Sequence, residues 1–497
     1  MADIVIIQPD TYFHDKLRTK PILPLGPLTA NCYTAKEYSI KLIDMRLNKN
    51  WILELKRELK RRPFCVAFGV ITGRQILSSL KASKIAKEYN IPVVWGGHHP
   101  TLLPRQTIEN HYIDYVIKGE GEITFYELIQ ALERNKPLNK IKGLLYKKKN
   151  KIHMNKEREF LNLDLLPELP YHIVNIKDYL FNSNGLKTLP IETSRGCKNK
   201  CSFCHNVPYN KSTWRGISSE KFIEKLNFIR SNFKEVKCIE ILDDHFNICN
   251  KRSQECLKKI KTDKFDFRFY IPGIRINDLA ELNNNQLKML EEHCNDVIIG
   301  LESGSQRIQD LMEKDIQINK VIEINKKMNS FDICLKYNLM SGFPTETRYD
   351  TKSTINIARR LIKDNKKSEI GPMNAYRPIY GTKMYTFALK HGLKEPVKLE
   401  SWVKHGNWGM ENFDNMPWLN KKRKEELKAL LVVSSLLAPQ SHTINESLNK
   451  NKLYNYTRKI YMNILEARMK SYFFKFMPEK AIYQFIRRFI EKTSCYK

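Results

Sequence analysis

Short apolar runs alternate with amphipathic helical patterns through the first part of the chain. The runs are continuous rather than interleaved with polar residues, which is typical of parallel strands covered on both faces. They are Asp3–Gln8, Ile40–Asp44, Phe64–Val70, Pro92–Trp95 and Tyr115–Lys118. Helical patterns cover Gln75–Tyr89 and Glu122–Glu133. We therefore predict a Rossmann-like α/β domain over residues 1–138.

Glycine-rich segments follow three of these runs, at Gly69–Gly73, Gly96–Thr101 and Gly119–Glu122. In an open parallel sheet the carboxyl ends of the strands share one edge, and ligands bind there. Glycines at that edge let the backbone approach a ligand closely. The pattern predicts a ligand site on this rim.

The next segment is polar and then rich in Pro and Leu, with Lys140–Lys156 followed by Leu165–Tyr171, which predicts a linker over residues 139–185. Over residues 186–392 further strand patterns alternate with helical ones and predict a partial (β/α)6 barrel of the TIM type. These strands are Leu189–Thr193, Cys238–Asp243, Phe267–Ile271, Val297–Leu301, Cys334–Ser341 and Met373–Arg377. Residues 393–497 are predicted to form a helical C-terminal region.

The chain is strongly basic, with 85 Lys and Arg against 54 Asp and Glu in 497 residues and a net charge of +31. This excess indicates an acidic partner, such as nucleic acid, an anionic membrane surface or a polyanionic substrate. A Lys-, Asn- and Ile-rich proteome would give the same excess without any partner. The charge alone does not choose between these explanations.

The N-terminus lacks the basic and apolar regions of a signal peptide. The longest apolar stretch, from Leu430 to Ala438, is far shorter than the ~20 residues needed to span a bilayer. We therefore expect a cytoplasmic protein, or one that is peripheral on the cytoplasmic face of the membrane.

The candidate chemistry lies in Cys197, Cys201 and Cys204, which follow the first strand of the predicted barrel. Three thiolates on one loop can bind three corners of a [4Fe–4S] cluster and leave one iron open. The alternative is a zinc site with His205 as fourth ligand, but structural zinc normally takes two pairs of closed ligands. The loop offers one group only, so we expect an iron–sulfur centre.

The cysteine loop and four later segments resemble the radical S-adenosylmethionine (SAM) superfamily, in the branch with an N-terminal cobalamin-binding domain. The segments follow the barrel strands in the order of the family. They are Ile241–Phe246, Gly300–Gly304, Gly342–Glu346 and Pro378–Thr382. The resemblance implies three cofactors: a [4Fe–4S] cluster on the three cysteines, SAM and cobalamin.

The resemblance also implies SAM contacts at the strand ends. Asp243 and Asp244 match the acceptors of the SAM amino group, and Glu302 and Ser303 match contacts to the ribose or the carboxylate. Ordinary strand-end capping is the alternative for Glu302 and Ser303.

Two further residues fit the same cofactor. Arg275 is a candidate partner of the SAM carboxylate, or else a surface residue. Phe203 resembles the family's aromatic residue near adenine; shielding of the cluster from solvent is its alternative role.

The cobalamin contacts are expected on the rim of the first domain. The candidates are Thr72, Gly97, His98, Thr101 and Glu120. Many cobalamin proteins carry Asp-x-His-x-x-Gly, whose His is the lower axial ligand, whereas the strand here ends Asp44-Met-Arg-Leu-Asn48. The resemblance therefore implies cobalt without a protein imidazole below it. His98 and His99 are alternatively a metal-binding pair, although a backbone-bonded turn is the simpler interpretation.

The function implied is C-methylation of an unactivated carbon in a small or lipid-like substrate, through a 5′-deoxyadenosyl radical and methylcobalamin. A radical SAM cyclase or oxidative enzyme with the same cofactors is the first alternative. RNA modification is the second, but the RNA methylthiotransferases hold another cluster on three N-terminal cysteines, and this domain has only Cys32 and Cys65. Nucleic acid is therefore not the expected partner. The expected protein partner is an electron donor such as flavodoxin or ferredoxin.

From Lys421 to Lys497 there are 17 Lys and Arg and 6 Asp and Glu, interleaved with aromatic residues. Helices at the membrane interface have this composition. The alternative is a helical lid that packs on the barrel. We expect the tail to close the barrel and also to contact anionic membrane.

Overall fold

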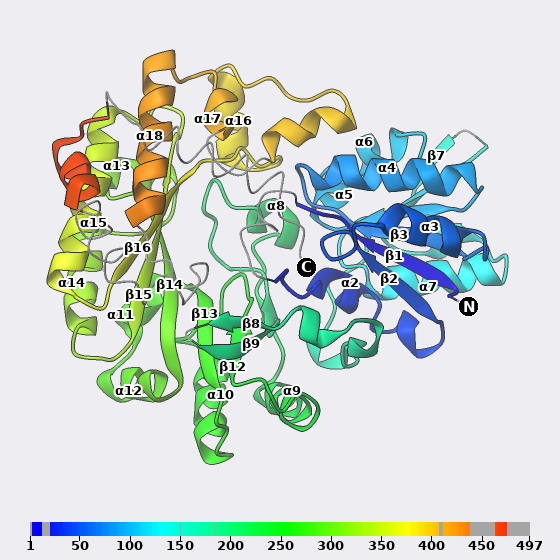
Figure 1. The fold of residues 1–497 in the computed structure, drawn as a ribbon, viewed down its shortest axis with the longest axis horizontal. Coiled ribbons are helices and arrows are strands. Elements are labelled where there is room, and N and C mark those ends of the chain that lie inside the picture. Colours follow the sequence, from blue (N-terminus) through cyan, green and yellow to red (C-terminus); the bar gives the residue numbers. More distant parts are fainter. Residues whose placement is uncertain are drawn as a thin grey trace. The chain divides into compact units, whose positions relative to one another are not determined.

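The computed structural model describes residues 2–11, 20–149, 151–183, 185–406, 411–437 and 463–474. The chain forms two compact units. The first runs to Leu180 and takes back a return segment from Lys394 to Gly406. The second begins at Phe181, runs to Leu393, and resumes in the described residues from Glu411 onward. Each unit is built around its own sheet (Figure 1).

The sheet of the first unit has the strand order β2-β1-β3-β4-β5-β6-β7, and β1 to β5 are parallel. Its strands are β1 (Ile4–Gln8), β2 (Ile40–Asp44), β3 (Cys65–Gly69), β4 (Val93–Gly96), β5 (Tyr115–Ile117), β6 (Leu144–Lys148) and β7 (Lys151–Met154). The predicted Rossmann-like domain is confirmed, because each of the five expected strands is present within two residues of its expected bounds.

The prediction that Lys140–Lys156 is a linker was wrong. β6 and β7 form an antiparallel hairpin there, and β6 extends the sheet beyond β5. The reason is a short apolar run hidden among the lysines: Leu144, Leu145 and Tyr146 are all buried. Lys151 of β7 lies on the outer strand, where charge discourages pairing with another sheet.

Helices cover both faces of this sheet, as parallel strands require. They are α2 (Leu25–Ala30), α3 (Trp51–Leu59), α4 (Gln75–Glu88), α5 (His98–Leu102), α6 (Pro104–Glu109) and α7 (Glu122–Glu133). Phe125 and Leu128 of α7 pack with Ile4, Ile6 and Val94 of the strands in one buried cluster. The sheet and its helices thus share one core.

The second unit is a half-barrel. Its sheet has the order β16-β15-β14-β13-β12-β9-β8, and all pairs are parallel except that of β8 and β9. The strands are β8 (Phe181–Ser183), β9 (Leu186–Ile191), β12 (Cys238–Ile241), β13 (Arg268–Ile274), β14 (Cys294–Glu302), β15 (Cys334–Ser341) and β16 (Glu369–Ala375). The six predicted barrel strands and the predicted fold class are confirmed. The antiparallel β8 was not predicted.

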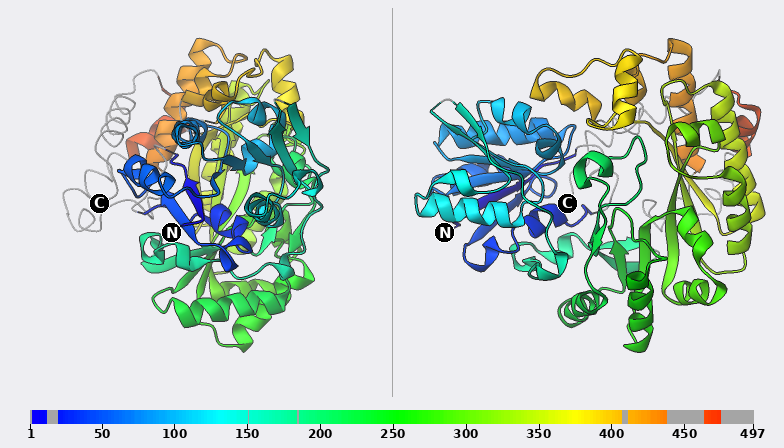
Figure 2. Two further views of the ribbon diagram at one scale, coloured as in Figure 1. Left: turned by 90° about the vertical axis from the view of Figure 1, so that its right-hand side faces the viewer. Right: turned by 180° about the vertical axis from the view of Figure 1, so that it is seen from behind.

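Helices follow the strands, and most of them lie on the outside of the curved sheet (Figures 1 and 2). They are α8 (Asn206–Asn210), α9 (Ser219–Asn232), α10 (Lys251–Thr262), α11 (Ile276–Glu281), α12 (Asn284–His293), α13 (Gln306–Leu311), α14 (Ile318–Met328), α15 (Arg348–Asp364) and α16 (Lys383–Lys390). A small ladder, β10 (Ser194–Arg195) with β11 (Arg215–Gly216), brackets the cysteine loop.

The C-terminal region is helical where it is described, as predicted, with α17 (Glu411–Asp414) and α18 (Lys421–Leu437). α18 packs along the outer strand β16, and the Ser434 hydroxyl accepts a hydrogen bond from the Met373 amide at 2.8 Å. Most of the aromatic and basic tail lies outside the described residues, so its membrane contact stays a prediction. Among the described helices, none is long and apolar enough to cross a bilayer.

Candidate active site

Asp243 ties the cysteine loop to the barrel. It follows β12, and its carboxylate accepts hydrogen bonds from the Thr193 amide and hydroxyl, both at 2.6 Å, and from the Ser194 hydroxyl at 2.7 Å. Burial, which outweighs these bonds, raises the pKa of Asp243 to about 6. The side chain therefore fixes the start of the loop; its contact with the SAM amino group stays a prediction.

Asp244 holds the next part of the loop. Its carboxylate accepts from the Gly196 amide at 2.8 Å and the Asn210 side chain at 3.2 Å, and it faces His205 Nε2 at 3.3 Å. Burial favours the neutral acid, but these partners outweigh it and lower the pKa of Asp244 to about 2. Gly196 has φ +80°, and a Cβ there would collide with the Thr213 carbonyl, so only glycine fits.

The three cysteines lie on the loop that these aspartates hold. Cys201 is buried, and Cys197 and Cys204 are half-buried. The Asn199 side chain donates to Cys197 Sγ at 3.2 Å. The loop is also bound at Ser202, whose amide donates to the Met312 carbonyl at 2.8 Å. Three thiols on one braced loop are a donor set that fits a [4Fe–4S] cluster with one open iron.

The zinc alternative would take His205 as its fourth ligand. His205 Nε2 lies 3.3 Å from a carboxylate oxygen of Asp244. Burial lowers the pKa of His205, but hydrogen bonds with Asp244 and Cys204 outweigh it and raise the pKa to about 10. The preference for an iron–sulfur centre over zinc rests on the spacing of the three cysteines.

His245 was missed by the sequence analysis. It is buried after β12, and its Nε2 lies 2.5 Å from a carboxylate oxygen of Asp278. Burial opposes the charged ring, but hydrogen bonds with Asp278 and Cys197 raise the pKa of His245 to about 9. Burial alone would raise the pKa of Cys197, but hydrogen bonds with His245 and Asn199 outweigh it and leave that pKa below its usual value. His245 lies within the Ile241–Phe246 segment that the sequence analysis matched to the family, but that analysis gave it no role.

A buried ion pair stands beside the loop. Glu302 ends β14 with φ +63°, and Lys314 Nζ lies 2.7 Å from its carboxylate; both side chains are about nine-tenths buried. Lys314 also lies 5.5 Å above the Phe203 ring. At Gly300 a Cβ would come within 2.9 Å of both charged groups, so glycine leaves the space for the pair. The sequence analysis predicted Phe203 and Glu302 but not Lys314.

Arg275 contacts the cysteine loop and the residue Lys314, whereas Ser303 is held elsewhere. The Arg275 guanidinium donates to the Asn199 side chain and to the Lys314 carbonyl, both at 2.6 Å. Ser303 is fully buried, and its hydroxyl lies 3.1 Å from that of Thr354 in α15. These contacts match the capping alternative for Ser303. The structure thus assembles Phe203, Glu302 and Arg275 around the cysteine loop.

The strands leave one face open to the barrel interior. Along β15 the buried Leu335, Tyr337 and Leu339 alternate with partly exposed residues. Because successive side chains point to opposite faces, the buried set packs on the helices and the other set lines the interior. Asn338 and Met340 are in the interior set toward the carboxyl end of the strand.

An aromatic wall leads from the cysteine loop across the carboxyl ends of β15 and β16. Phe203 contacts Phe343 edge to face, with ring centres 6.2 Å apart, and Phe343 stacks on Tyr376 at 5.0 Å. Trp418, before α18, lies 6.3 Å from Tyr376. The Tyr376 hydroxyl is buried and has no hydrogen-bond partner among the described residues. Such a group normally has a partner, so a ligand or water is expected beside it.

The rim of the first unit carries the predicted cobalamin contacts. Thr72 Oγ1 lies 3.0 Å from His99 Nδ1. Thr101 accepts from the Gly119 amide at 3.0 Å, and Glu120 accepts from the Leu161 amide at 2.8 Å.

Gly97 and His98 complete the predicted set. Gly97 has φ +95°, and a Cβ on it would lie 2.8 Å from the Val70 amide, so the loops after β3 and β4 meet closely there. His98 is exposed. The structure therefore brings the three glycine-rich segments to one rim, where backbone can approach a flat cofactor.

Arg46 stands two residues after Asp44, where the axial His motif would place imidazole. Its guanidinium binds the Asp44 carboxylate through Nε at 2.9 Å and Nη2 at 2.7 Å, and the Tyr179 hydroxyl donates to the same carboxylate at 3.0 Å. Both charged side chains are buried. Arg46, rather than a histidine, therefore occupies the position of the axial ligand in that motif, and cobalt without a protein imidazole below it stays a prediction.

Comparisons with known proteins place the chain. A model of the B12 binding domain matches residues 28–129, and one of the radical SAM superfamily matches residues 191–358. An uncharacterized methyltransferase of Pyrococcus horikoshii is 30% identical over 374 residues, which cover 74% of this chain and 79% of the relative. The chain belongs to the cobalamin-binding branch of the radical SAM superfamily. Its cofactors are cobalamin, SAM and a [4Fe–4S] cluster.

Two other relatives have assigned activities. Bacteriochlorophyllide d C-8(2)-methyltransferase of Chlorobaculum tepidum is 24% identical over 354 residues, 67% of this chain and 70% of the relative. Anaerobic magnesium-protoporphyrin IX monomethyl ester cyclase of Synechocystis is 29% identical over 139 residues, 28% of this chain and 27% of the relative.

Solved structures share the fold. The cobalamin-dependent SAM radical enzyme OxsB, with aqua-cobalamin and SAM bound, has a TM-score of 0.73 at 16% identity and covers 98% of this chain and 75% of its own. The radical SAM methyltransferase TsrM from Kitasatospora setae has a TM-score of 0.63 at 15% identity, covering 78% and 76%.

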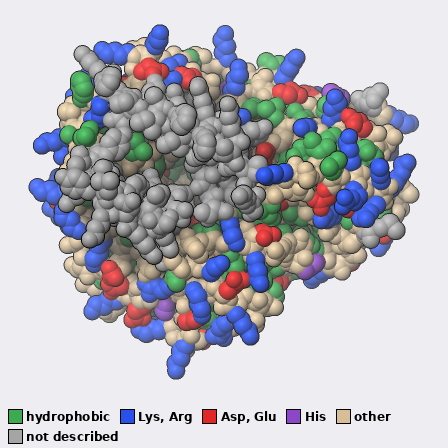
Figure 3. Space-filling model, viewed as in Figure 1, with side chains coloured by type: hydrophobic (Ala, Val, Ile, Leu, Met, Phe, Trp, Pro, Cys, Tyr) green, Lys and Arg blue, Asp and Glu red, His purple; other side chains and the backbone are tan. Residues whose placement is uncertain are grey.

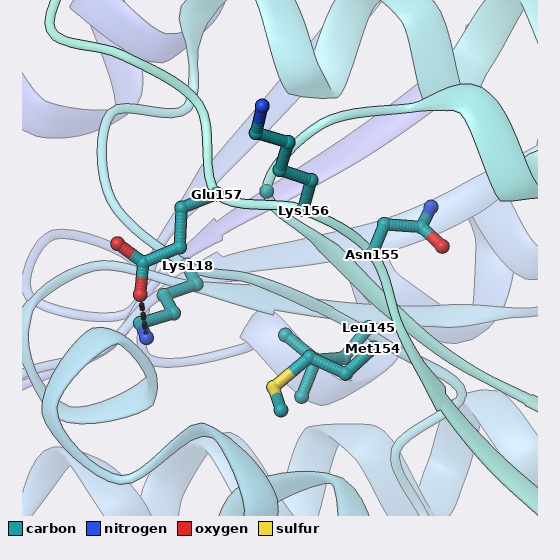
Figure 4. Close-up of a pocket in the computed structure, with 7 residues that line it drawn as sticks. Lys118, Leu145, Met154, Asn155, Lys156 and Glu157 are labelled. Atoms are coloured by element: carbon teal, nitrogen blue, oxygen red, sulfur yellow. Dashed lines mark hydrogen bonds and ion pairs between the residues drawn. The ribbon is translucent and has the colours of Figure 1, made fainter.

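A separate pocket of about 290 Å³ lies in the first unit beside β6 and β7 (Figure 4). Lys118 and Glu157 pair across it, and Met154 lines it. None of the predicted site residues takes part. On the face drawn in Figure 3, Lys and Arg side chains are spread over the surface with Asp and Glu among them.

Proposed function

We propose that this radical SAM enzyme methylates an unactivated carbon of a small or lipid-like substrate. The observation that carries the proposal is the group formed by the cysteine loop, Phe203 and the Glu302–Lys314 pair at the mouth of a half-barrel, in a chain that also has a B12 binding domain. When bound, the three cofactors supply a 5′-deoxyadenosyl radical and a transferable methyl group. The relatives named methyltransferases favour this outcome over cyclisation.

The chain's own residues bind and orient these groups. Cys197, Cys201 and Cys204 would ligate three irons, and Asp243 and Asp244 hold the loop on which they lie. Phe203 offers a flat face to the adenine of SAM. Lys314 and Arg275 provide positive charge for its carboxylate.

The aromatic wall supports an apolar or flat unsaturated substrate. Phe343 and Tyr376 form its buried part, and the interior positions of β15 include the uncharged Asn338 and Met340. A water-poor barrel interior protects a carbon radical from side reactions. The unpaired Tyr376 hydroxyl would donate a hydrogen bond to one polar group of the substrate.

A one-electron donor of the flavodoxin or ferredoxin type is the proposed partner. Lys198 and Lys200 are exposed on the cysteine loop and give it a basic outer surface for an acidic carrier. Charge reversal at both positions should slow 5′-deoxyadenosine formation with the carrier protein and leave the rate with dithionite unchanged. Lys258, exposed on α10, is the matched control.

The deciding experiment is anaerobic turnover with SAM labelled in its methyl group, using cell extracts as the substrate source and Cys201→Ala as the control. A methylated product should carry the labelled methyl group. A product with fewer hydrogens and no label would indicate the cyclase or oxidative alternative instead.

A further inference from the structure

The chain returns to the first unit after it has built the barrel. Residues from Lys394 to Gly406 belong to that unit, although they lie far beyond the matched B12 binding domain. Their 3-10 helix η6 (Leu399–His405) packs along α4. The first unit is therefore made from two stretches of chain.

Trp402 is the buried centre of this return segment, with 1% of its surface exposed. Its indole N–H donates to Gln106 Oε1 at 2.5 Å. The Gln106 amide in turn donates to the carbonyls of Pro396 and Val397, both at 3.0 Å. One side chain of α6 thus binds the segment at three points.

Trp402 also fixes the rim. Its ring meets the fully buried His99 ring edge to face, with centres 5.9 Å apart, and His99 Nδ1 lies 3.0 Å from Thr72 Oγ1. His99 follows Gly97 and His98, and Thr72 follows β3, so both carry predicted cobalamin contacts or adjoin them. The contact chain runs from the return segment to the cofactor rim.

The segment then touches the rim through its backbone. A Cβ on Gly73, whose φ is +126°, would lie 2.8 Å from the Gly406 carbonyl oxygen. A Cβ on Gly406 would collide with the Thr72 carbonyl. Two glycines therefore permit a close crossing beside the loop after β3.

We propose that the return segment is part of the cobalamin site, and that Trp402, latched by Gln106, is a positioning residue for the rim formed by Thr72, Gly97 and His98. The segment contacts the loop that follows β3 and also contacts helix α5. It holds both in the geometry that binds the corrin ring. The proposal rests on cobalamin binding alone and does not depend on which carbon is methylated. Preorganised loops bind more tightly because they lose less freedom on binding.

The test is titration of the full-length cluster-loaded enzyme with hydroxocobalamin, followed by absorbance. Trp402→Ala should weaken binding about tenfold or more, and Trp402→Phe, which keeps a ring against His99, by about threefold. Gln106→Leu, which removes the latch but keeps the volume, should fall between them. Iron content should stay at the wild-type level, because the cysteine loop belongs to the second unit.

Leu55→Ala is the matched control, since Leu55 is fully buried in α3 and its truncation destabilises the same unit away from the rim. At an equal drop in melting temperature it should leave cobalamin affinity within about twofold. If Leu55→Ala and Trp402→Ala weakened cobalamin binding equally, Trp402 would act only through the stability of the unit, and the proposal would be overturned. Wild-type affinity in both Trp402→Ala and Gln106→Leu would also overturn it.

Discussion

The Glu302–Lys314 pair makes a sharp prediction, because both charges are almost fully enclosed beside the cysteine loop. Replacing Lys314 by Met leaves a buried carboxylate without its counter-charge, and replacing Glu302 by Gln leaves a buried ammonium. Removing one partner of such a pair typically destabilises by 3–5 kcal/mol. Because about a tenth of each side chain is still exposed, we expect each single variant to lose about 3 kcal/mol of unfolding free energy, the low end of that range. For a unit of this size that is a fall in melting temperature of roughly 6 °C or more.

The double variant should be much closer to wild type, because neither charge is then left uncompensated. The expected coupling energy is about 2 kcal/mol or more, measured by thermal melting of the three variants and the wild type under anaerobic conditions. The exposed pair Lys383–Glu313, at 2.6 Å, provides the control, and Lys383→Met should change stability by less than about 1 kcal/mol. Additive losses in the Glu302–Lys314 cycle would refute the reasoning.

Three further predictions concern single residues. Cys201→Ala should abolish iron–sulfur absorbance and SAM cleavage after anaerobic reconstitution, whereas stoichiometric zinc without iron in the wild type would contradict the cluster assignment. Burial lowers the pKa of His99 to about 4 from its usual 6.5, so the neutral ring contributes stability that is fully present above pH 6.5. As the pH falls toward 4, the protein should lose about 3 kcal/mol of this stability. His99→Gln should reduce the pH dependence of the melting temperature, and an unchanged pH dependence in this variant would contradict the prediction. Tyr376→Phe removes a buried hydroxyl that has no hydrogen-bond partner among the described residues. The free energy of unfolding should stay the same or rise by up to about 1 kcal/mol. A clear loss of stability in thermal melting would show that the hydroxyl has a partner.

The parallel strands could be predicted because each is an apolar run bounded by polar turns, and burial on both faces requires that pattern. The cysteine loop could be predicted because its spacing is local. The hairpin β6–β7 could not, since Leu144–Tyr146 is too short a run among lysines to stand out, and its burial depends on the free side of β5. The pairing of Glu302 with Lys314 could not be predicted for a similar reason. Lys314 lies one helix away in sequence, and only the positive φ of Glu302 and the space above Gly300 bring the two charges together.

The return segment has a consequence for the order of synthesis. Trp402 is made after all the barrel strands, so the first unit lacks a buried side chain of its core until 222 residues after Leu180 (402 − 180) have been translated. At ~5–20 residues per second that interval is roughly 10–45 s, during which the surface that Trp402 covers, including His99 and Gln106, is open to water or chaperones. The core of the nascent N-terminal unit is thus completed only after every strand of the half-barrel has been synthesised.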